Sequence, residues 1–427
     1  MVKNKVQPGE KAPIFKERHR HNMEYFYIKQ TLKLLEKKHV VYPMTVVLLV
    51  LVILGHIYSL IGKPTPFPNQ HVAVKTAEHV ADFCLTASII IIILYLPKNA
   101  ENFYQLFSSL YPEGNKLFGP LLAMKKHHFW RNFLICNVCI GSLITFDASF
   151  FLVNFGWSTY KYLVFGDVQF YLYNLVLLLL LTLARKLELR FAELNELLEY
   201  KTDNFLKTTS NNKTSENEIE THLSYILSSE HFYSVRTFKM MHYELCKLVK
   251  RFNEMFGRII LFTILFSIAN ILAKVTFIID FYVTPRNDSD KNKWAVFMGI
   301  ICFWIFANMV KPMFYVHFFR KYSTPFNLQA QSFLFAFYGE QITKEGEKTT
   351  RTCFYLLNKV PFQPKNNDEA FLQEELKCFA FQSYSHIPCL SAGGFFDVNF
   401  RVLGLMISSV TSYLMVIIQF LLRQQTS

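Results

Sequence analysis

Charged side chains are scarce in this chain of 427 residues. Asp, Glu, Lys and Arg together make up 18% of it, against about 25% in an average soluble domain. Hydrophobic residues make up 52%, and the mean hydropathy is +0.19. This composition excludes an ordinary soluble enzyme and indicates a protein that crosses a membrane several times.

Other absences narrow the class of protein further. None of the eight cysteines falls in a segment expected outside the cell, so we expect no structural disulfides. The first forty residues lack the apolar core of a cleavable signal peptide, and there is no internal repeat of the kind that transporters carry. His56 has no partner at a metal-ligand spacing, and no His, Cys or Asp constellation offers a nucleophile. We therefore expect no enzyme activity, no metal and no cofactor.

Seven apolar runs reach the length of a membrane-spanning helix. About twenty residues at 1.5 Å each cover the roughly 30 Å of hydrocarbon in a bilayer. The sequence therefore predicts an all-α membrane protein with seven transmembrane helices. The runs are Tyr42–Ile61, Val80–Leu96, Asn132–Phe155, Val168–Ala184, Ile259–Val283, Trp294–Phe319 and Val402–Leu422.

The positive charges are distributed unevenly across this topology. Lys and Arg number 36 in the segments 1–41, 97–131, 185–258 and 320–401, whereas the alternate segments hold only 7. Because cytoplasmic loops carry the excess of Lys and Arg, we expect a cytoplasmic N-terminus and an extracellular C-terminus. The same placement explains the net charge of +13 without a nucleic-acid partner. Asn287, in the sequon Asn287-Asp288-Ser289, is a candidate for glycosylation because its loop is expected outside.

Two of the spans are expected to continue into the cytoplasm as amphipathic helices. Apolar residues recur at spacings of three and four after the fourth span and before the fifth, and a polar linker (208–218) separates them. A weaker candidate covers Asp368–Tyr384. These stripes predict a small cytoplasmic helical bundle, formed either within one subunit or between subunits. The stripe after the fourth span consists of Leu183, Leu187, Phe191, Leu194 and Leu198, and the stripe before the fifth span consists of Phe238, Met241, Leu245, Leu248, Phe252 and Met255.

These predictions divide the chain into consecutive regions. The expected regions are a cytoplasmic N-terminal segment (1–41), spans one to four (42–184), a cytoplasmic helical extension with its linker (185–258), spans five and six (259–319), a cytoplasmic loop with an anchor helix (320–401), a seventh span (402–422), which is pore-lining if the polar face described next meets water, and an extracellular tail (423–427).

The last apolar run carries a stripe of polar side chains. Ser408, Ser412, Met415 and Gln419 follow one another at spacings of four, three and four, which places them on one face of a helix. An amide exposed to lipid would leave its polar atoms without hydrogen bonds, so this face should meet water or protein. Two interpretations remain open: rings of these groups line an ion pore, or they form hydrogen bonds with neighbouring spans.

The end of the chain resembles the insect gustatory receptor family. The last span of that family carries Thr-Tyr, five apolar residues and then Gln-Phe, which here reads Ser412-Tyr413, five apolar residues and Gln419-Phe420. The preceding segment, 393–403, is similar to the family's aromatic lead-in with an Asp, an Asn and a basic residue. Ser412 departs from the usual Thr but keeps the hydroxyl.

This resemblance implies a ligand-gated, nonselective cation channel in the plasma membrane of chemosensory neurons. Related channels are tetramers with the seventh spans around a central pore, and Gln419 matches the glutamine placed at the gate. The implied partners are a small-molecule tastant, either a sugar or a bitter compound, membrane lipid, and other copies or paralogous subunits. The alternatives are a metabotropic seven-span receptor and an odorant receptor of the same superfamily.

Two charges lie well inside apolar runs. Asp147 and Lys274 are each fifteen residues from the inner end of their span, so both are expected about 22 Å above the cytoplasmic face. A charge in a membrane must be paired or hydrated. Asp147, Asn270 and Lys274 are therefore candidates to line a ligand pocket in the outer leaflet, and a purely structural ion pair is the alternative.

Overall fold

The computed structural model describes residues 38–62, 72–110, 129–211, 229–283, 330–360, 363 and 367–426. In these residues the regular structure is helical and no strand forms, although a single bridge pairs Ser391 with Asp397. The all-α prediction is confirmed for this part of the chain. The helices are α2 (Lys38–Gly62), α3 (Val72–Lys98), α4 (Ala100–Leu110), α5 (Phe129–Phe155), α6 (Trp157–Asn211), α8 (Ser229–Val283), α10 (Ala330–Leu357), α11 (Asn367–Ser385) and α12 (Phe400–Thr426).

Within the described residues, five helices are long and apolar enough to cross a membrane. These are α2, α3, α6, α8 and α12. Helix α5 adds a shorter apolar stretch, Ile140–Phe155, where the third span is expected. The expected sixth span, Trp294–Phe319, lies outside the described residues.

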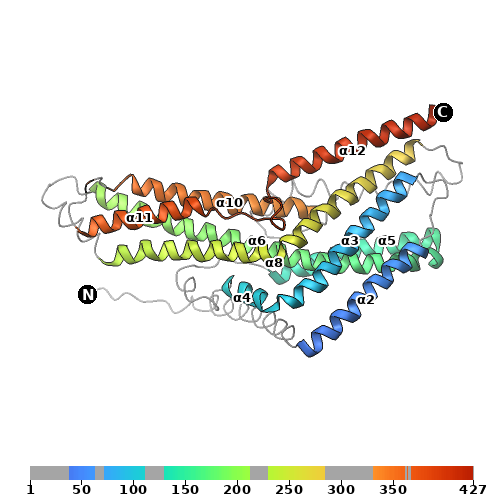
Figure 1. Ribbon diagram of the computed structural model, residues 1–427, viewed down its shortest axis with the longest axis horizontal. Helices are drawn as coiled ribbons and strands as arrows, with labels where there is room; N and C mark the ends of the chain where they lie inside the picture. Colours follow the sequence, from blue (N-terminus) through green and yellow to red (C-terminus); the bar gives the residue numbers. More distant parts are fainter. Residues whose placement is uncertain are drawn as a thin grey trace, which may run out of the picture.

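Helices α6 and α8 give the molecule its elongated shape. Each has 55 residues and is therefore about 82 Å long, more than twice the thickness of the hydrocarbon core. Their apolar halves pack with α2, α3 and α5, and their polar halves run on together with α10 and α11 (Figure 1). We call this second part the helical bundle.

The amphipathic stripes predicted from the sequence are buried in the bundle. The α6 stripe from Leu183 to Leu198 is at most 4% exposed, and the α8 stripe from Phe238 to Met255 at most 8%. Helix α10 packs against α6, and α11 packs against both α10 and α8. Helices of the same chain therefore cover both stripes, as the first of the two predicted arrangements requires.

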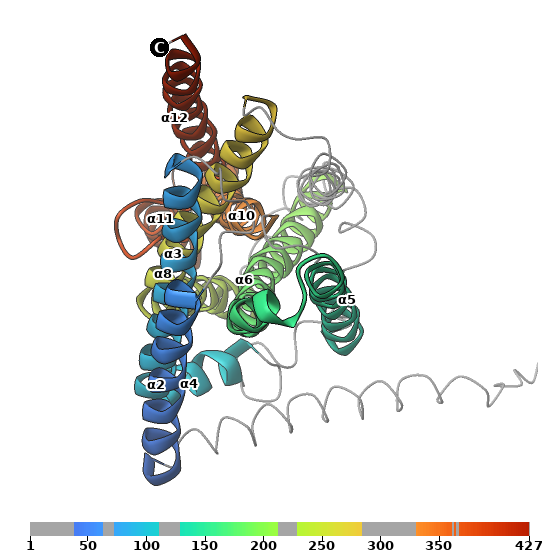
Figure 2. The same ribbon diagram turned by 90° about the vertical axis from the view of Figure 1, so that its right-hand side faces the viewer.

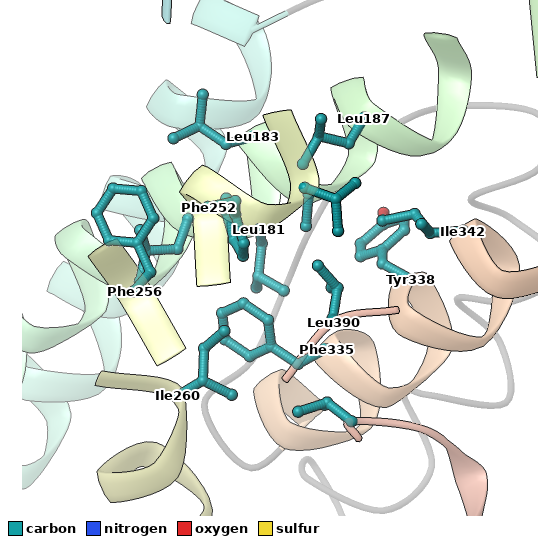
Figure 3. Close-up of a cluster of buried hydrophobic side chains, with 14 of the residues drawn as sticks. Leu181, Leu183, Leu187, Phe252, Phe256, Ile260, Phe335, Tyr338, Ile342 and Leu390 are labelled. Carbon is teal, nitrogen blue, oxygen red and sulfur yellow. The ribbon is translucent and has the colours of Figure 1, made fainter. Parts of the chain in front are cut away.

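The largest buried cluster extends from the apolar helices into the bundle, and Figure 3 shows the part near their junction. Ile260 of α8 lies beside Phe335 of α10 (Figure 3), Phe252 and Ile342 belong to the same cluster, and all four side chains are fully buried. A buried side chain of this size contributes about 1.5–3 kcal/mol through the hydrophobic effect. This cluster fixes α8 and α10 at the level from which α12 departs.

A tight turn joins α5 to α6. Gly156 has φ +74°, a left-handed conformation that favours glycine, and its N–H donates to the carbonyl of Leu152 at 3.1 Å. The two helices therefore pack as an antiparallel hairpin. Seen from the end of the molecule, α5 lies beside α6 and away from α2 and α3 (Figure 2).

Candidate functional site

Helix α12 packs on its own chain along only one side. Val402, Met406, Val410 and Ile417 are buried and face α8 and α10. The side chains of the predicted polar stripe lie on nearly the opposite face, because 100° per residue separates the two sets by roughly 150°. All four are exposed in the single chain: Ser408, Ser412, Met415 and Gln419.

Two further motif residues of α12 are Tyr413 and Phe420. Tyr413 is 43% exposed, whereas the side chain of Phe420 lies outside the described residues. The glycosylation candidate Asn287 also lies outside them. In both figures α12 stands at the edge of the molecule (Figures 1 and 2). Its polar stripe is thus available to water or to another protein subunit.

A short loop from His386 to Asn399 attaches the base of α12 to the bundle. The loop folds back on itself: the Ala392 N–H donates to the Phe396 carbonyl at 2.9 Å, and the Val398 N–H donates to the Leu390 carbonyl at 2.7 Å. Asn399 then caps α12, because its side-chain oxygen accepts a hydrogen bond from the Arg401 N–H at 3.0 Å.

Side chains of α8 and α10 hold this loop in place. The Asn253 side chain donates to the Cys389 carbonyl at 2.8 Å and accepts from the Ser391 N–H at 3.0 Å. The Thr343 hydroxyl lies 3.1 Å from the Pro388 carbonyl. The position of α12 is therefore tied to both helices.

Three glycines let the loop lie directly on the helix backbones. A Cβ at Gly257 would lie 2.6 Å from the Gly393 nitrogen, and Gly339 and Gly346 are more crowded still, by the Val398 carbonyl oxygen and the Pro388 ring. Any larger side chain at these positions would push the loop away from α8 or α10. These close contacts could not be predicted from the sequence, because a glycine within a helix does not indicate which distant segment packs against it.

The structure brings the charged residues predicted for the ligand site together. The Asp147 carboxylate on α5 lies within electrostatic range of the Lys274 ammonium group on α8, and both side chains are half-buried. Asn270 lies one turn before Lys274 on α8, and its side chain makes no hydrogen bond to another described residue. Asp147 and Lys274 therefore interact in the structure, and their shared depth in the membrane stays a prediction.

Sequence reasoning missed a second carboxylate in this cluster. Asp167 of α6 is within electrostatic range of Asp147, and its Oδ2 accepts a hydrogen bond from the Tyr160 hydroxyl at 3.3 Å. The apolar run of the fourth span is centred on Val168–Ala184 with flanking length from Leu163 to Phe165, so Asp167 fell at its edge and was not singled out. The helix instead starts at Trp157, directly after the Gly156 turn, and so places Asp167 about 15 Å along it.

A polar network joins three apolar helices beside this cluster. The Thr86 hydroxyl of α3 lies 3.0 Å from Nδ1 of His56 on α2 and 3.2 Å from Oε1 of Gln169 on α6. Gln169 in turn donates to the Val52 carbonyl at 3.3 Å. His56, which has no metal-ligand partner in the sequence, is thus part of a hydrogen-bonded contact between helices. Within the described residues no group of His, Cys, Asp or Glu is arranged to hold a metal ion.

The family model for the seven-transmembrane chemosensory receptors matches residues 44–424. This chain belongs to that family. The chemosensory receptor's fold is similar to that of the insect olfactory receptor OR5 from Machilis hrabei in complex with eugenol, with a TM-score of 0.56, 9% identity, and coverage of 93% of this chain and 100% of that chain. A second structure of the OR5 receptor gives a TM-score of 0.49 at the same identity and coverage. No curated protein matches the chain.

These comparisons confirm the chemosensory resemblance drawn from the last span. At such low identity the likeness to OR5 shows the fold alone, and it agrees with the helices of the chemosensory receptor over nearly its whole length. The chain is a membrane protein with several apolar helices.

Proposed function

We propose that this chemosensory receptor is a subunit of a ligand-gated, nonselective cation channel. The observation that carries the proposal is the face of α12 formed by Ser408, Ser412, Met415 and Gln419, which its own chain leaves exposed while the opposite face packs on α8 and α10. Hydroxyl, thioether and amide groups can hydrate a passing cation, and the apolar residues between them can close a pore by dewetting.

Several copies of the chain are needed to make such a pore. We propose a tetramer, of identical or paralogous subunits, with one α12 from each around a central path and Gln419 at the gate. The exposed stripe supports this arrangement because four copies would bury it around water rather than leave it in lipid. Binding of a ligand would open the gate and depolarise a chemosensory neuron at its plasma membrane.

The motif in α12 supports the gustatory branch of the family. Ser412-Tyr413 and Gln419-Phe420 keep the gustatory spacing, so we propose a tastant of the sugar or bitter class as the ligand. An odorant receptor of the same fold is the second candidate, supported by the structural likeness to OR5. A metabotropic receptor is the third, and it alone would require G proteins for its response.

We propose that the ligand binds among the charges in the outer half of the apolar helices. The supporting observation is that Asp147 of α5 interacts electrostatically both with Asp167 of α6 and with Lys274 of α8. Two carboxylates and one ammonium group in an apolar region favour contact with water or a polar ligand. Tyr160, which donates to Asp167, and Asn270 complete the proposed site.

The orientation proposed for the chain is N-terminus inside, with the bundle in the cytoplasm and residues 423–427 outside. The charge distribution along the sequence supports it. An Asn287→Gln variant tests it: the wild-type chain made in insect cells should lose mass on treatment with an N-glycosidase, and the variant should not. If Asn287 of the wild-type chain is not glycosylated, the orientation is tested with a Gln425→Cys variant instead. A membrane-impermeant thiol reagent added outside the cell should label that cysteine.

Whole-cell recording from cells that express this chain alone is the experiment that tests the function. Panels of sugars and bitter alkaloids should evoke a current that reverses near 0 mV and persists when G-protein signalling is blocked. Gln419→Leu should change permeability or gating at normal surface delivery. Thr411→Val is the matched control, because Thr411 lies off the stripe and its hydroxyl already donates to the Ile407 carbonyl at 2.8 Å. Identical currents from wild type and Gln419→Leu would contradict the pore assignment.

A further inference from the structure

Buried polar side chains follow one another along the contact between α3, α6 and α8. The first of them on α6 is Gln169 of the network described above, which donates to the Val52 carbonyl and accepts from the Thr86 hydroxyl. Tyr173 lies one turn further along the same helix. Its side chain is 1% exposed, and its ring packs edge-on against Phe266 of α8, with 5.3 Å between the ring centres. Tyr173 is thus enclosed in the apolar half of the molecule.

The hydroxyl group of Tyr173 differs from its polar neighbours in its hydrogen bonding. The Gln169 amide uses both its oxygen and its nitrogen, whereas no group of the described residues lies in hydrogen-bonding geometry with the Tyr173 hydroxyl. Among these residues it is the one buried side-chain nitrogen or oxygen without such a partner. A hydroxyl buried without a hydrogen bond is destabilising, and a bound water or ion is a usual reason for finding one.

Two other polar groups lie near the Tyr173 hydroxyl. The Thr263 hydroxyl of α8 and the Cys84 thiol of α3 are both close enough to interact with it electrostatically. Thr263 already donates its hydrogen to the Ile259 carbonyl at 2.8 Å, so its oxygen can only accept a further hydrogen bond. A thiol is a weak donor and a weak acceptor. The three helices therefore bring together one free donor, one acceptor and one group that can act as either.

We propose that Tyr173, Thr263 and Cys84 bind an ordered water molecule where α3, α6 and α8 meet. A buried water typically makes about three hydrogen bonds to groups that would otherwise be unpaired. This water accepts a hydrogen bond from the Tyr173 hydroxyl and donates one to the Thr263 oxygen, and the Cys84 sulfur is its third, weaker partner. The site goes beyond the proposed channel function, because it requires neither a ligand nor a second subunit.

X-ray hydroxyl-radical footprinting of the purified full-length chain in detergent tests the proposal. Radiolysis turns a bound water into a hydroxyl radical, which modifies the adjacent side chain even where bulk water has no access. Tyr173 should therefore be modified several-fold faster than Phe252, an aromatic side chain that is fully buried in the apolar cluster. Thr263→Val should lower the modification rate of Tyr173 several-fold. Thr276→Val is the matched control, because Thr276 is equally buried on α8 and its hydroxyl donates to the Leu272 carbonyl of its own helix at 2.7 Å.

Thermal unfolding of a Tyr173→Phe variant in detergent gives an independent measurement. The substitution removes a hydrogen bond to the water, so the midpoint of unfolding should fall by about 1–3 °C. If the hydroxyl has no partner in the working protein, its removal should leave the midpoint unchanged or raise it.

Three results would overturn the proposal. The first is modification of Tyr173 as slow as that of Phe252, which would refute the water even if Tyr173→Phe is less stable, because a direct bond to Thr263 would then explain the loss. The second is an unfolding midpoint that does not fall in Tyr173→Phe. The third is an equal effect of Thr263→Val and Thr276→Val on Tyr173 modification. If Tyr173→Phe does not purify as a folded protein, footprinting of the wild-type chain decides by itself.

Discussion

The side-chain oxygen of Asn253 accepts a hydrogen bond from the backbone N–H of Ser391 at 3.0 Å, across 138 residues of sequence. The amide nitrogen of the same side chain donates to the Cys389 carbonyl. One side chain of α8 therefore forms hydrogen bonds with two backbone groups, the Ser391 N–H and the Cys389 carbonyl, of the loop that leads into α12. A partly buried loop held in this way cannot shift without losing both bonds.

Asn253→Leu should destabilise the protein and disturb gating. Removing the side-chain amide leaves two partly buried backbone groups unpaired, at about 1–3 kcal/mol each. The midpoint of thermal unfolding in detergent should fall, and ligand-evoked current should change at equal surface expression. Asn253→Asp keeps the bond from Ser391 and loses the one to Cys389, so it should give an intermediate effect. An Asn253→Leu protein as stable as wild type would show that the loop is held by its other contacts.

Gly339→Ala should displace α12, whereas Gly404→Ala should not. A Cβ on Gly339 collides with the carbonyl oxygen of Val398, a backbone atom that cannot rotate away. Gly404 has open space around it, and alanine there should stabilise α12 by about 1 kcal/mol. Thermal unfolding of both variants, together with whole-cell current, checks the difference. Equal behaviour of the two variants would mean that the loop does not lie against α10 in the working receptor.

The bundle should lose stability in mild acid because of His242. This fully buried side chain of α8 packs against the rings of Phe191 and Phe379, and its Nδ1 lies 3.8 Å from Sγ of Cys246. Burial, with a smaller contribution from nearby His386, lowers the pKa of His242 to about 4. The unfolded chain therefore binds a proton that the folded chain excludes, so stability falls as the pH drops from about 6.5 to 4.

The loss of free energy of unfolding across this window should approach 3 kcal/mol. Thermal unfolding in detergent from pH 7.5 to 4.5 measures it, and His242→Gln should flatten the pH dependence in that range. His79→Gln, which changes an exposed histidine of α3, is the control and should leave the slope as in wild type. An unchanged slope in His242→Gln would assign the acid sensitivity to other groups.

Charge variants should separate a ligand site from a structural ion pair. If Asp147 and Lys274 contact the ligand, Asp147→Asn and Lys274→Met should each shift the half-maximal ligand concentration tenfold or more at normal surface expression. Asp167→Asn, at the carboxylate that the sequence did not predict, should also shift the half-maximal ligand concentration tenfold or more. Lys161→Met, which removes a cation in the first turns of α6 beside Tyr162, should have little effect.

The double variant Asp147→Asn/Lys274→Met provides the complementary measurement. Removing one partner of a buried pair leaves an uncompensated charge, whereas removing both is close to neutral for stability. If the double variant is as stable as wild type and responds normally to ligand, the two residues form a structural pair and the proposed ligand site is wrong.

The periodicity of apolar and polar residues predicted which face of a single helix is buried and which is exposed. The stripes from Leu183 to Leu198 and from Phe238 to Met255 are buried. Apolar residues three and four positions apart lie on one face of a helix, so a single packing surface buries all of them. The same reasoning placed Ser408 and Gln419 on one exposed face of α12. Each of these results needs only helical geometry and the identity of the side chains.

Contacts between distant segments could not be predicted in this way. The bonds of Asn253 to the loop, and of Thr86 to His56 and Gln169, depend on which helices meet and at what height. Asp167 was missed for a local reason: the left-handed Gly156 starts α6 eleven residues earlier than the apolar run suggests. The helix start set by one glycine therefore places Asp167 well inside the helix that carries the fourth apolar run.

The unbroken length of α6 and α8 sets how movement can pass through the molecule. Each helix runs from the charged cluster near Asp147 to the far end of the bundle without interruption. Bending such a rod sharply would break backbone hydrogen bonds unless a proline or bulge were present. Movement at the Asp147 end of either helix is therefore passed along continuous helical backbone to the junction where Phe252 and Phe335 are buried, because no break between the two parts can absorb it.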